Sequence, residues 1–498
     1  MITIKTLLIS EENIAAGIEL PEYLELTVEG DKLEPGKDMW DLIIMNRQVY
    51  PAEKRILKRL GRAYCFFVMD SVELDADTRE VYDCLAGQVL EAEQLEDFLK
   101  NRARDYFSTS YGEKLISNEI TVGQAYMEGL KYNGMYSAEI SGDFGEDFTQ
   151  LFSWKKTVNL YGDQAMDLWL EYRKNDSVEI MMQVQQFVMG SVSEVARVWD
   201  FTEEDLQQVV TIENPGMSGS LFFSIRARGH GTMELVGLHT RLSRHGLGTF
   251  VVGDDRISTS DREEVFCYFD PGDLKPPMNV YFSGYKTKEG FEGYYMMHGM
   301  GNPFLLIADQ RLEGGGFYLG SYEYEQAVVA AIHKYMRQLN FTPDQVIMSG
   351  ISMGTIGSMY YGADIKPHAL LLGKPLASLG TIAANERINR PGGFATSLDL
   401  LRYHAGDLRQ ESVDRLDERF WNKFGMADWS NTKIIASYML EDDYDSTAYQ
   451  NMIERLNSTG VQIYGKGLHG RHNDNTNGIV TWFKGQYQKI LREDFGRE

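Results

Sequence analysis

The sequence contains few of the residues that build metal sites and disulfide frameworks. It has only three cysteines in 498 residues, Cys65, Cys84 and Cys267, and no two of them have the spacing of a zinc or redox motif. The nine histidines include no His-x-x-x-His pair. We therefore expect reduced, structural thiols, as in a cytoplasmic protein, and no metal site.

Positive charge and long hydrophobic runs are also scarce. The chain has 49 lysines and arginines against 73 aspartates and glutamates, which gives a formal net charge of −24. Such an acidic chain offers no broad nucleic-acid surface and no polybasic membrane anchor. No apolar run approaches the length of a membrane helix. Residues 1–17 have one lysine and a short apolar stretch before two glutamates, so we expect no signal peptide.

Three segments with different patterns of apolar and turn residues predict a mixed α/β protein. Residues 1–135 alternate apolar runs with helical stretches, which is typical of a small, Rossmann-like α/β domain with a parallel sheet. Residues 136–272 contain β-rich segments separated by turn residues, which favours a β-sandwich of jelly-roll type. Residues 273–498 alternate strands and helices again and are expected to form a second α/β domain, of α/β-hydrolase-like type because of the serine motif described below. We interpret residues 270–277, which are rich in proline, as a linker.

The predicted sandwich contains three tryptophans, Trp154, Trp169 and Trp199. Sandwiches of this kind often bind carbohydrate through exposed aromatic side chains, so one interpretation is a carbohydrate-binding-like domain. The other is that these large side chains fill the core, as aromatic residues commonly do.

Ser352 lies in a Gly-x-Ser-x-Gly motif within QVIMSGISMGTIGSMYYG, residues 345–362. Before it, residues 324–339 carry apolar side chains at helical spacing, and a proline-containing break and a short apolar run follow. Helix, turn, strand, serine and helix is the order of a nucleophile elbow. Because the motif alone is weak, the alternative is a glycine-rich turn in some other α/β unit.

A serine nucleophile of this type needs backbone donors for the oxyanion that forms on attack. The amide of Met353, at the expected start of the helix, would point toward that oxyanion. In hydrolases with an elbow, a second donor comes from the turn after an earlier strand. Residues 278–282 read as that strand, so the amides of Gly284 and Tyr285 are candidates; the alternative there is an ordinary turn.

An acid and a histidine should follow the serine, each after a late strand. The β-like run at 433–440 ends in an acidic cluster, and the run at 461–464 leads into a loop with His469 and His472. We predict His472 as the base, because it lies closer to the last helix, with His469 in reserve. We choose Asp442 as the acid, with Glu441 and Asp443 left open beside it.

Several stretches together resemble one family. They are FSGYKTKEGFEGYYMM (282–297), LEGGGFYLGS (312–321), SGISMGTIGSMYYGAD (349–364), LLLGKPLASLGTIAANERINRPGGFATSLDLL (370–401) and GRHND (470–474). They are similar to the second of the three accessory secretory proteins of the accessory Sec system in Gram-positive bacteria. The resemblance extends over nearly the whole chain.

This resemblance implies a function that the residues alone do not specify. The family acts in the cytoplasm, and at the membrane through its complex, with two sibling accessory proteins and the accessory SecA motor ATPase. It serves the export of glycosylated serine-rich-repeat adhesins and is thought to O-acetylate their N-acetylglucosamine. The reaction needs an acetyl donor of unknown identity and no cofactor. By position, the nucleophile matches Ser352, the base matches His472, and the acid falls within Glu441–Asp443.

Two other functions remain open from the residues. With water as the acceptor, the same serine, acid and histidine would give a carbohydrate or small-ester esterase. A non-catalytic scaffold that escorts an adhesin to the motor would keep the fold without its chemistry. We also expect residues 373–430, which contain Trp421 and Trp429, to form a cap or partner surface with exposed aromatics.

Overall fold

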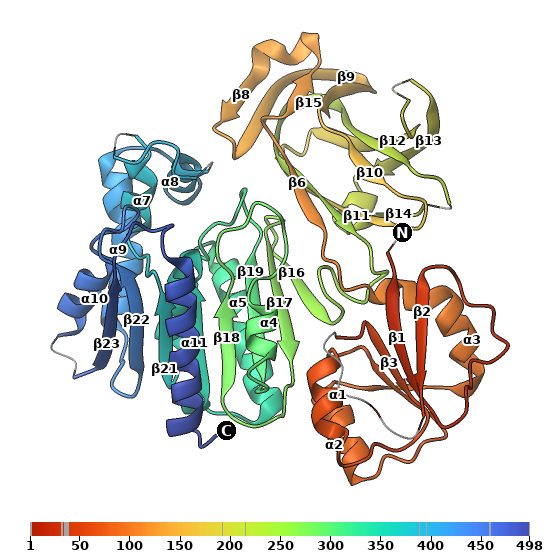
Figure 1. The fold of residues 1–498 in the computed structure, drawn as a ribbon. Helices are drawn as coiled ribbons and strands as arrows, with labels where there is room; N and C mark the ends of the chain where they lie inside the picture. Colours follow the sequence, from red (N-terminus) through yellow and green to blue (C-terminus); the bar gives the residue numbers. More distant parts are fainter. Residues whose placement is uncertain are drawn as a thin grey trace.

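The computed structural model describes residues 2–30, 33, 39–191, 193–214, 216–387, 389–394, 396–457 and 460–497. These residues form three separate β-sheets, and helices pack mainly on the first and third (Figure 1). The expected mixed α/β class is confirmed. Within the described ranges, we find no helix with the length and apolar character needed to cross a membrane.

The first sheet is parallel, with strand order β2-β1-β3-β4-β5. Its central strands β3 and β4 are apolar runs buried along their whole length, as expected where helices cover both faces of a parallel sheet. The elements are β1 (Ile4–Ile9), β2 (Leu24–Glu29), β3 (Leu42–Met45), α1 (Lys54–Leu60), β4 (Phe66–Met69), α2 (Ala76–Cys84), β5 (Gln88–Leu90) and α3 (Leu95–Asp97).

The second sheet is antiparallel throughout and is organised around one long strand. Strand β15 has 24 residues; its first half pairs with β12 and its second half with β11, and irregularities in its pairing with β9 bend it. The strands are β6 (Gly112–Ile116), β7 (Ile120–Val122), β8 (Leu130–Asn133), β9 (Ser137–Trp154), β10 (Val158–Leu160), β11 (Met166–Lys174), β12 (Val178–Val188), β13 (Val195–Thr202), β14 (Val210–Ile212) and β15 (Gly219–Leu242).

The third sheet has the strand order β16-β17-β19-β18-β20-β21-β22-β23. The pairs β16–β17 and β17–β19 are antiparallel, and every later pair is parallel. The strands are β16 (Asp254–Ser258), β17 (Glu264–Asp270), β18 (Met278–Phe282), β19 (Phe304–Asp309), β20 (Val346–Ile351), β21 (Ala369–Gly373), β22 (Lys433–Met439) and β23 (Gln462–Leu468).

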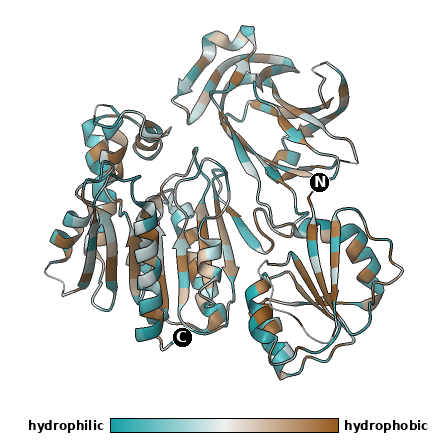
Figure 2. Ribbon diagram, in the orientation of Figure 1, coloured by the Kyte–Doolittle hydropathy of each residue, from teal (hydrophilic) through white to brown (hydrophobic). Residues whose placement is uncertain are grey.

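Helices connect the parallel strands of this sheet, and a further helix, α11 (Thr476–Glu493), follows its last strand. The connecting helices are α4 (Tyr294–His298), α5 (Tyr322–Leu339), α6 (Met353–Ile365), α7 (Leu379–Asn385), α8 (Ser397–Ala405), α9 (Gln410–Met426) and α10 (Ala448–Leu456). Figure 2 shows hydrophobic residues in the central strands and a mixture of hydrophobic and hydrophilic residues along the helices. Because parallel strands end at one edge of their sheet, the loops after β18, β20, β22 and β23 meet there.

The strand pairing differs from the sequence interpretation at both expected boundaries. Strands β6 to β8 precede residue 136 but belong to the second sheet, and β16 and β17 precede residue 273 but belong to the third. The segment at 270–277 therefore joins two strands of one sheet, and its interpretation as a linker is wrong. The pairings that decide these assignments include long-range ones, β6 with β15 and β17 with β19, which local composition does not reveal.

The tryptophans are mostly buried. Trp154 and Trp169 have exposed fractions of 0% and 4%, which confirms the core interpretation for these two. The expectation of exposed aromatics at 373–430 is wrong for its tryptophans, since Trp421 and Trp429 are 4% and 1% exposed and pack into the core of the third sheet. That segment forms α7, α8 and α9.

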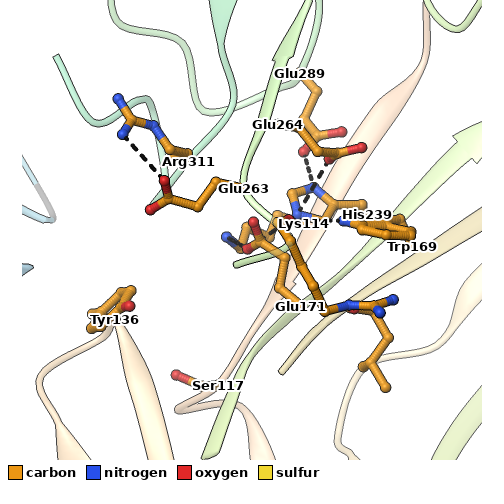
Figure 3. Close-up of polar contacts among 12 residues, drawn as sticks. Lys114, Ser117, Tyr136, Trp169, Glu171, His239, Glu263, Glu264, Glu289 and Arg311 are labelled. Atoms are coloured by element: carbon orange, nitrogen blue, oxygen red, sulfur yellow. Dashed lines mark hydrogen bonds and ion pairs between the residues drawn. The ribbon is translucent and has the colours of Figure 1, made fainter. Parts of the chain in front are cut away.

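A buried cluster of charged side chains joins the second sheet to the third (Figure 3). Arg241 of β15 lies 2.6 Å from Glu264 of β17 and 2.7 Å from Glu289, in the loop between β18 and α4. His239, also on β15, contacts Glu289 through Nδ1 and lies 3.3 Å from Glu171 of β11 through Nε2. Glu289 therefore fixes the loop at 283–293 to the second sheet.

The cluster shifts the protonation of its carboxylates. Burial alone would raise the pKa of Glu289, but the charges of Arg241 and His239 outweigh burial and lower it to about 2. The pKa of Glu264 is lowered in the same way, by Arg241 against the effect of burial. Both carboxylates therefore stay ionised and paired near neutral pH.

Loss of one cation from this cluster should destabilise the protein strongly. The substitution Arg241→Gln leaves Glu264 and Glu289 buried without their main partner, which should cost about 3–5 kcal/mol of unfolding free energy. Arg228→Gln is the matched control, because Arg228 pairs with Glu179 at the surface and its side chain is 41% exposed. The control should cost under about 1 kcal/mol in urea denaturation. Equal losses in the two variants would contradict this assignment.

The stabilisation from the cluster should also depend on pH in a definite direction. Because the pKa of Glu289 is lowered in the folded state, its contribution is fully present above about pH 4.5 and is lost as the pH falls toward 2. The stability difference between the native protein and Arg241→Gln should therefore shrink on acidification below about pH 5. Urea titrations at a series of pH values measure it; a difference that grows in acid would refute the interpretation.

Candidate active site

Ser352 lies at a sharp turn between β20 and α6, as the elbow motif predicts. Its backbone has φ 56° and ψ −122°, a positive φ that a residue with a side chain adopts only when its surroundings enforce it. The turn holds the hydroxyl clear of the strand, where a carbonyl carbon can approach it.

The two glycines of the motif are required by close packing. A Cβ at Gly350 would lie 2.3 Å from the backbone of Gly354, and a Cβ at Gly354 would lie 2.1 Å from the carbonyl oxygen of Phe282. Both distances are impossible for a real side chain. The elbow therefore packs α6 directly against β18, the strand that leads to the proposed oxyanion turn.

The structure brings Ser352, His472 and Asp442 into one chain of hydrogen bonds. The Ser352 Oγ lies 2.8 Å from His472 Nε2, and the His472 Nδ1 lies 2.8 Å from Asp442 Oδ2. His472 and Asp442 are 3% and 9% exposed. The three residues come from the loops after β20, β22 and β23, which end at one edge of the third sheet.

Backbone amides hold the Asp442 carboxylate in place. Its Oδ1 accepts hydrogen bonds from the N–H groups of Tyr444, at 2.9 Å, and Asp445, at 3.1 Å. Burial would raise the pKa of Asp442, but the hydrogen bond and charge of His472, together with these amides, lower it below its usual value. An ionised carboxylate here fixes the imidazole tautomer and stabilises an imidazolium.

The alternative residues have other partners. His469 pairs with Glu441 at 3.0 Å, and the two side chains are 87% and 53% exposed. Asp443 accepts the backbone N–H of His472 at 3.0 Å and pairs with Arg390 at 2.8 Å. Asp443 thus supports the histidine loop, whereas Asp442 contacts the imidazole.

The expected oxyanion donors lie around Ser352, and one is already engaged. Met353 begins α6, and Gly284 and Tyr285 follow β18. The Gly284 N–H donates to the carboxylate of Glu292 at 2.6 Å. The Glu292 carboxylate therefore occupies the position from which an oxyanion would accept a hydrogen bond from the Gly284 N–H. An oxyanion could use this amide only after the carboxylate moves away.

A strained, glycine-rich loop packs against these donors. A Cβ at Gly314 would lie 2.0 Å from the ring of Tyr285, and one at Gly315 would lie 2.7 Å from the side chain of Met353. Phe317 and Tyr318 both have positive φ, 57° and 64°. Tyr318 is held by its N–H donating to Asp309 and its hydroxyl donating to the Ser283 carbonyl, each within 2.8 Å. This strain places Phe317 in the site.

Ser352 and His472 open into a cavity of about 460 Å³. Several lining residues were not predicted from the sequence: Glu292, Phe317, Lys374, Phe394 and Tyr444. They belong to loops, where no hydrophobic periodicity marks them. The available signal was the glycine-rich character of LEGGGFYLGS and of the PGGF segment, since conformationally special loops often surround sites.

Lys374, at the end of β21, forms hydrogen bonds with the loop that carries His472. Its Nζ donates to the Asp474 carbonyl at 2.9 Å and to the Thr476 hydroxyl at 3.2 Å. Burial lowers the pKa of this lysine, although the carboxylates of Asp442 and Asp474 act against burial. His472 therefore rests on a loop fixed at both of its flanks, by Asp443 and by Lys374.

Comparisons with known proteins give one consistent family. The family model described as the accessory Sec system GspB-transporter matches residues 16–497. A member from Streptococcus gordonii, the second accessory secretory protein of its accessory Sec system, is 40% identical over 412 residues, 83% of this chain and 81% of the relative. The Staphylococcus aureus protein of the same name is 36% identical over 479 residues, 96% and 90% of the two chains.

A solved structure from Streptococcus agalactiae is similar over the whole chain. A chain of the glycosylation-associated protein (Gap123) complex from Streptococcus agalactiae is 36% identical, with a TM-score of 0.85. The match covers 100% of this chain and 99% of that chain. The arrangement of all three sheets is thus shared with a protein solved within a complex.

The hydrogen-bond chain predicts that Ser352 reacts with a serine-directed probe such as a fluorophosphonate. The substitution His472→Ala should slow labelling by about 10²- to 10⁴-fold, because the serine loses its base. The matched control is His469→Ala, which removes an exposed histidine from the same loop and should leave the rate unchanged. Labelling is followed by mass spectrometry of the Ser352 peptide. Equal slowing in both variants, or labelling at another serine, would rule out this base.

Proposed function

Because the chain belongs to the GspB-transporter family of accessory Sec system proteins, we propose that it is a serine-dependent O-acetyltransferase of α/β-hydrolase type. The observation that carries this proposal is the continuous hydrogen-bond chain from Ser352 through His472 to Asp442. It provides a nucleophile, a base and an orienting carboxylate in the geometry that acyl transfer requires.

In the first half of the reaction, Ser352 takes the acetyl group. His472 removes the hydroxyl proton as Oγ attacks the acetyl carbonyl carbon, and Asp442 stabilises the imidazolium that results. The oxyanion accepts from the Met353 amide and from the turn at Gly284 and Tyr285 once Glu292 has withdrawn. The bond to the leaving group then breaks, and the leaving group receives the proton from His472. An acetyl-serine remains.

In the second half, a hydroxyl group takes the acetyl group from Ser352. His472 removes the proton of the acceptor hydroxyl, whose oxygen attacks the acetyl carbon, and the proton then returns to Ser352 as the ester bond to it breaks. In the proposed reaction the acceptor is N-acetylglucosamine on a serine-rich-repeat adhesin. With water as the acceptor, the same steps make the protein an esterase.

The family also supports an assembly around this enzyme. The matching solved chain belongs to a complex of glycosylation-associated proteins. We propose that this chain likewise binds two sibling accessory secretory proteins, and that the assembly delivers the glycosylated adhesin to the accessory SecA motor ATPase at the cytoplasmic membrane surface. Catalysis and delivery would use different surfaces, since the triad lies within a cavity of the third sheet.

The central test is the acetyl content of the adhesin glycans in cells. Mass spectrometry should find acetylated N-acetylglucosamine with the native protein and none with Ser352→Ala, because the nucleophile is gone. Adhesin export is measured in the same cells. If acetylation is lost while export persists, the two functions are separable. Unchanged acetylation in a folded Ser352→Ala protein would leave only the scaffold function.

A further inference from the structure

Four aromatic rings form a continuous wall of the cavity beside Ser352, and Phe394 lies at its centre. The Phe394 ring centroid lies 5.5 Å from that of Tyr285, 5.7 Å from that of Phe317 and 6.0 Å from that of Tyr444. Phe317 is the most buried of the four, with an exposed fraction of 2%, and also lines the cavity. Phe394, Tyr285 and Tyr444 are only partly buried and line the open space.

Hydrogen bonds hold the backbone of the two residues before Phe394. The Glu386 carboxylate accepts the N–H groups of Gly392, at 2.7 Å, and Gly393, at 3.0 Å. The Tyr444 hydroxyl donates to the Gly393 carbonyl at 3.0 Å. Gly392 has φ 73°, a conformation that favours glycine. These contacts therefore fix the backbone immediately before Phe394, whose ring packs against Tyr285, Phe317 and Tyr444.

The same loop is tied to the acidic end of the triad. The Arg390 guanidinium pairs with Asp443 at 2.8 Å and lies over the Tyr444 ring at 3.6 Å. The Tyr444 ring in turn contacts the His472 ring, with centroids 4.5 Å apart. Arg390 covers one face of Tyr444, and the Phe394 ring stacks beside Tyr444 in the wall of the cavity. The wall reaches His472 at its Tyr444 end, so this end lies on the His472 side of the cavity.

That side is where an acceptor must bind. In the second half of the reaction His472 takes the proton of the attacking hydroxyl, so the acceptor oxygen has to lie within hydrogen-bond reach of Nε2. Polar groups face the cavity as well, including the carboxylate of Glu292 and the side chains of Asn473 and Thr476. An apolar ring face and a few hydrogen-bonding groups together suit a ligand with one apolar face and a polar edge.

We infer that Phe394 is the stacking platform of an acceptor subsite that binds a pyranose ring. This inference rests on the proposed function and specifies which residue selects a sugar over water. The C–H face of a pyranose carries partial positive charge and packs on the negative face of an aromatic ring, while its hydroxyl groups reach the polar groups of the cavity. A stacked sugar displaces water from His472 and holds its hydroxyl near the acetyl carbon.

The test is the partitioning of one acetyl-enzyme between two acceptors. The full-length protein is supplied with p-nitrophenyl acetate, and the products formed with methyl N-acetylglucosaminide and with water are quantified. This ratio depends only on steps after the acetyl-serine forms, so any role in binding the donor cancels. The substitution Phe394→Leu should lower the ratio of transfer to hydrolysis by about tenfold or more, because the stacking face is lost.

Two controls show whether the ring face is responsible. Phe394→Tyr keeps that face and should keep the ratio of the native protein. The second control replaces the glycoside by glycerol, an alcohol without a ring face. The ratio of acetyl transfer to glycerol over hydrolysis should differ little between the native protein and Phe394→Leu. A ratio for the glycoside that is unchanged in Phe394→Leu, or one that falls equally for glycerol, would overturn the inference.

Failure of the inference is distinguishable from failure of the proposed function. If Ser352→Ala consumes the donor as fast as the native protein, the acetyl-serine mechanism itself fails. If Ser352→Ala is inactive but the native protein transfers nothing to the glycoside while it hydrolyses the donor, the nucleophile stands and the acceptor subsite fails.

Discussion

The backbone conformation at Ser352 is the constraint on which the site depends. A residue with a side chain adopts φ 56° only because Gly350 and Gly354 let β20, α6 and β18 approach more closely than a Cβ would permit. That approach puts the serine hydroxyl at the carboxyl edge of the third sheet. Since the neighbouring strands are parallel, the loops after β22 and β23 end at the same edge and deliver Asp442 and His472 to it.

The same edge also depends on parts of the molecule outside the third sheet. The loop at 283–293 carries Gly284 and Tyr285, and its Glu289 is buried against His239 and Arg241 of the second sheet. The turn that carries the proposed oxyanion donors is thus anchored by a charged contact between the second and third sheets. This gives a physical reason for the second sheet to accompany the third: it fixes a loop of the candidate site.

The sequence was sufficient for the elements that local patterns specify. Hydrophobic patterns located α5, β20 and β22, and chain order placed His472 and an acid after the serine. The choice among three adjacent carboxylates stayed open, because it depends on the turn in which amides of Tyr444 and Asp445 orient Asp442. Phe394 and Glu292 were missed, since they reach the cavity from loops. Strand β6 was misplaced because its partner β15 lies in a remote segment, and β16 because it joins the third sheet through β17, which pairs with the more distant β19.

The central claim is that Ser352 carries an acetyl group during turnover. It is tested most directly by mixing the protein with an activated acetyl ester, quenching in acid within the first turnover and mapping acetyl groups by peptide mass spectrometry. The account predicts acetylation of the Ser352 peptide, with faster loss when a glycoside acceptor is present. Consumption of the donor by the native protein with no acetyl group on Ser352 would contradict it.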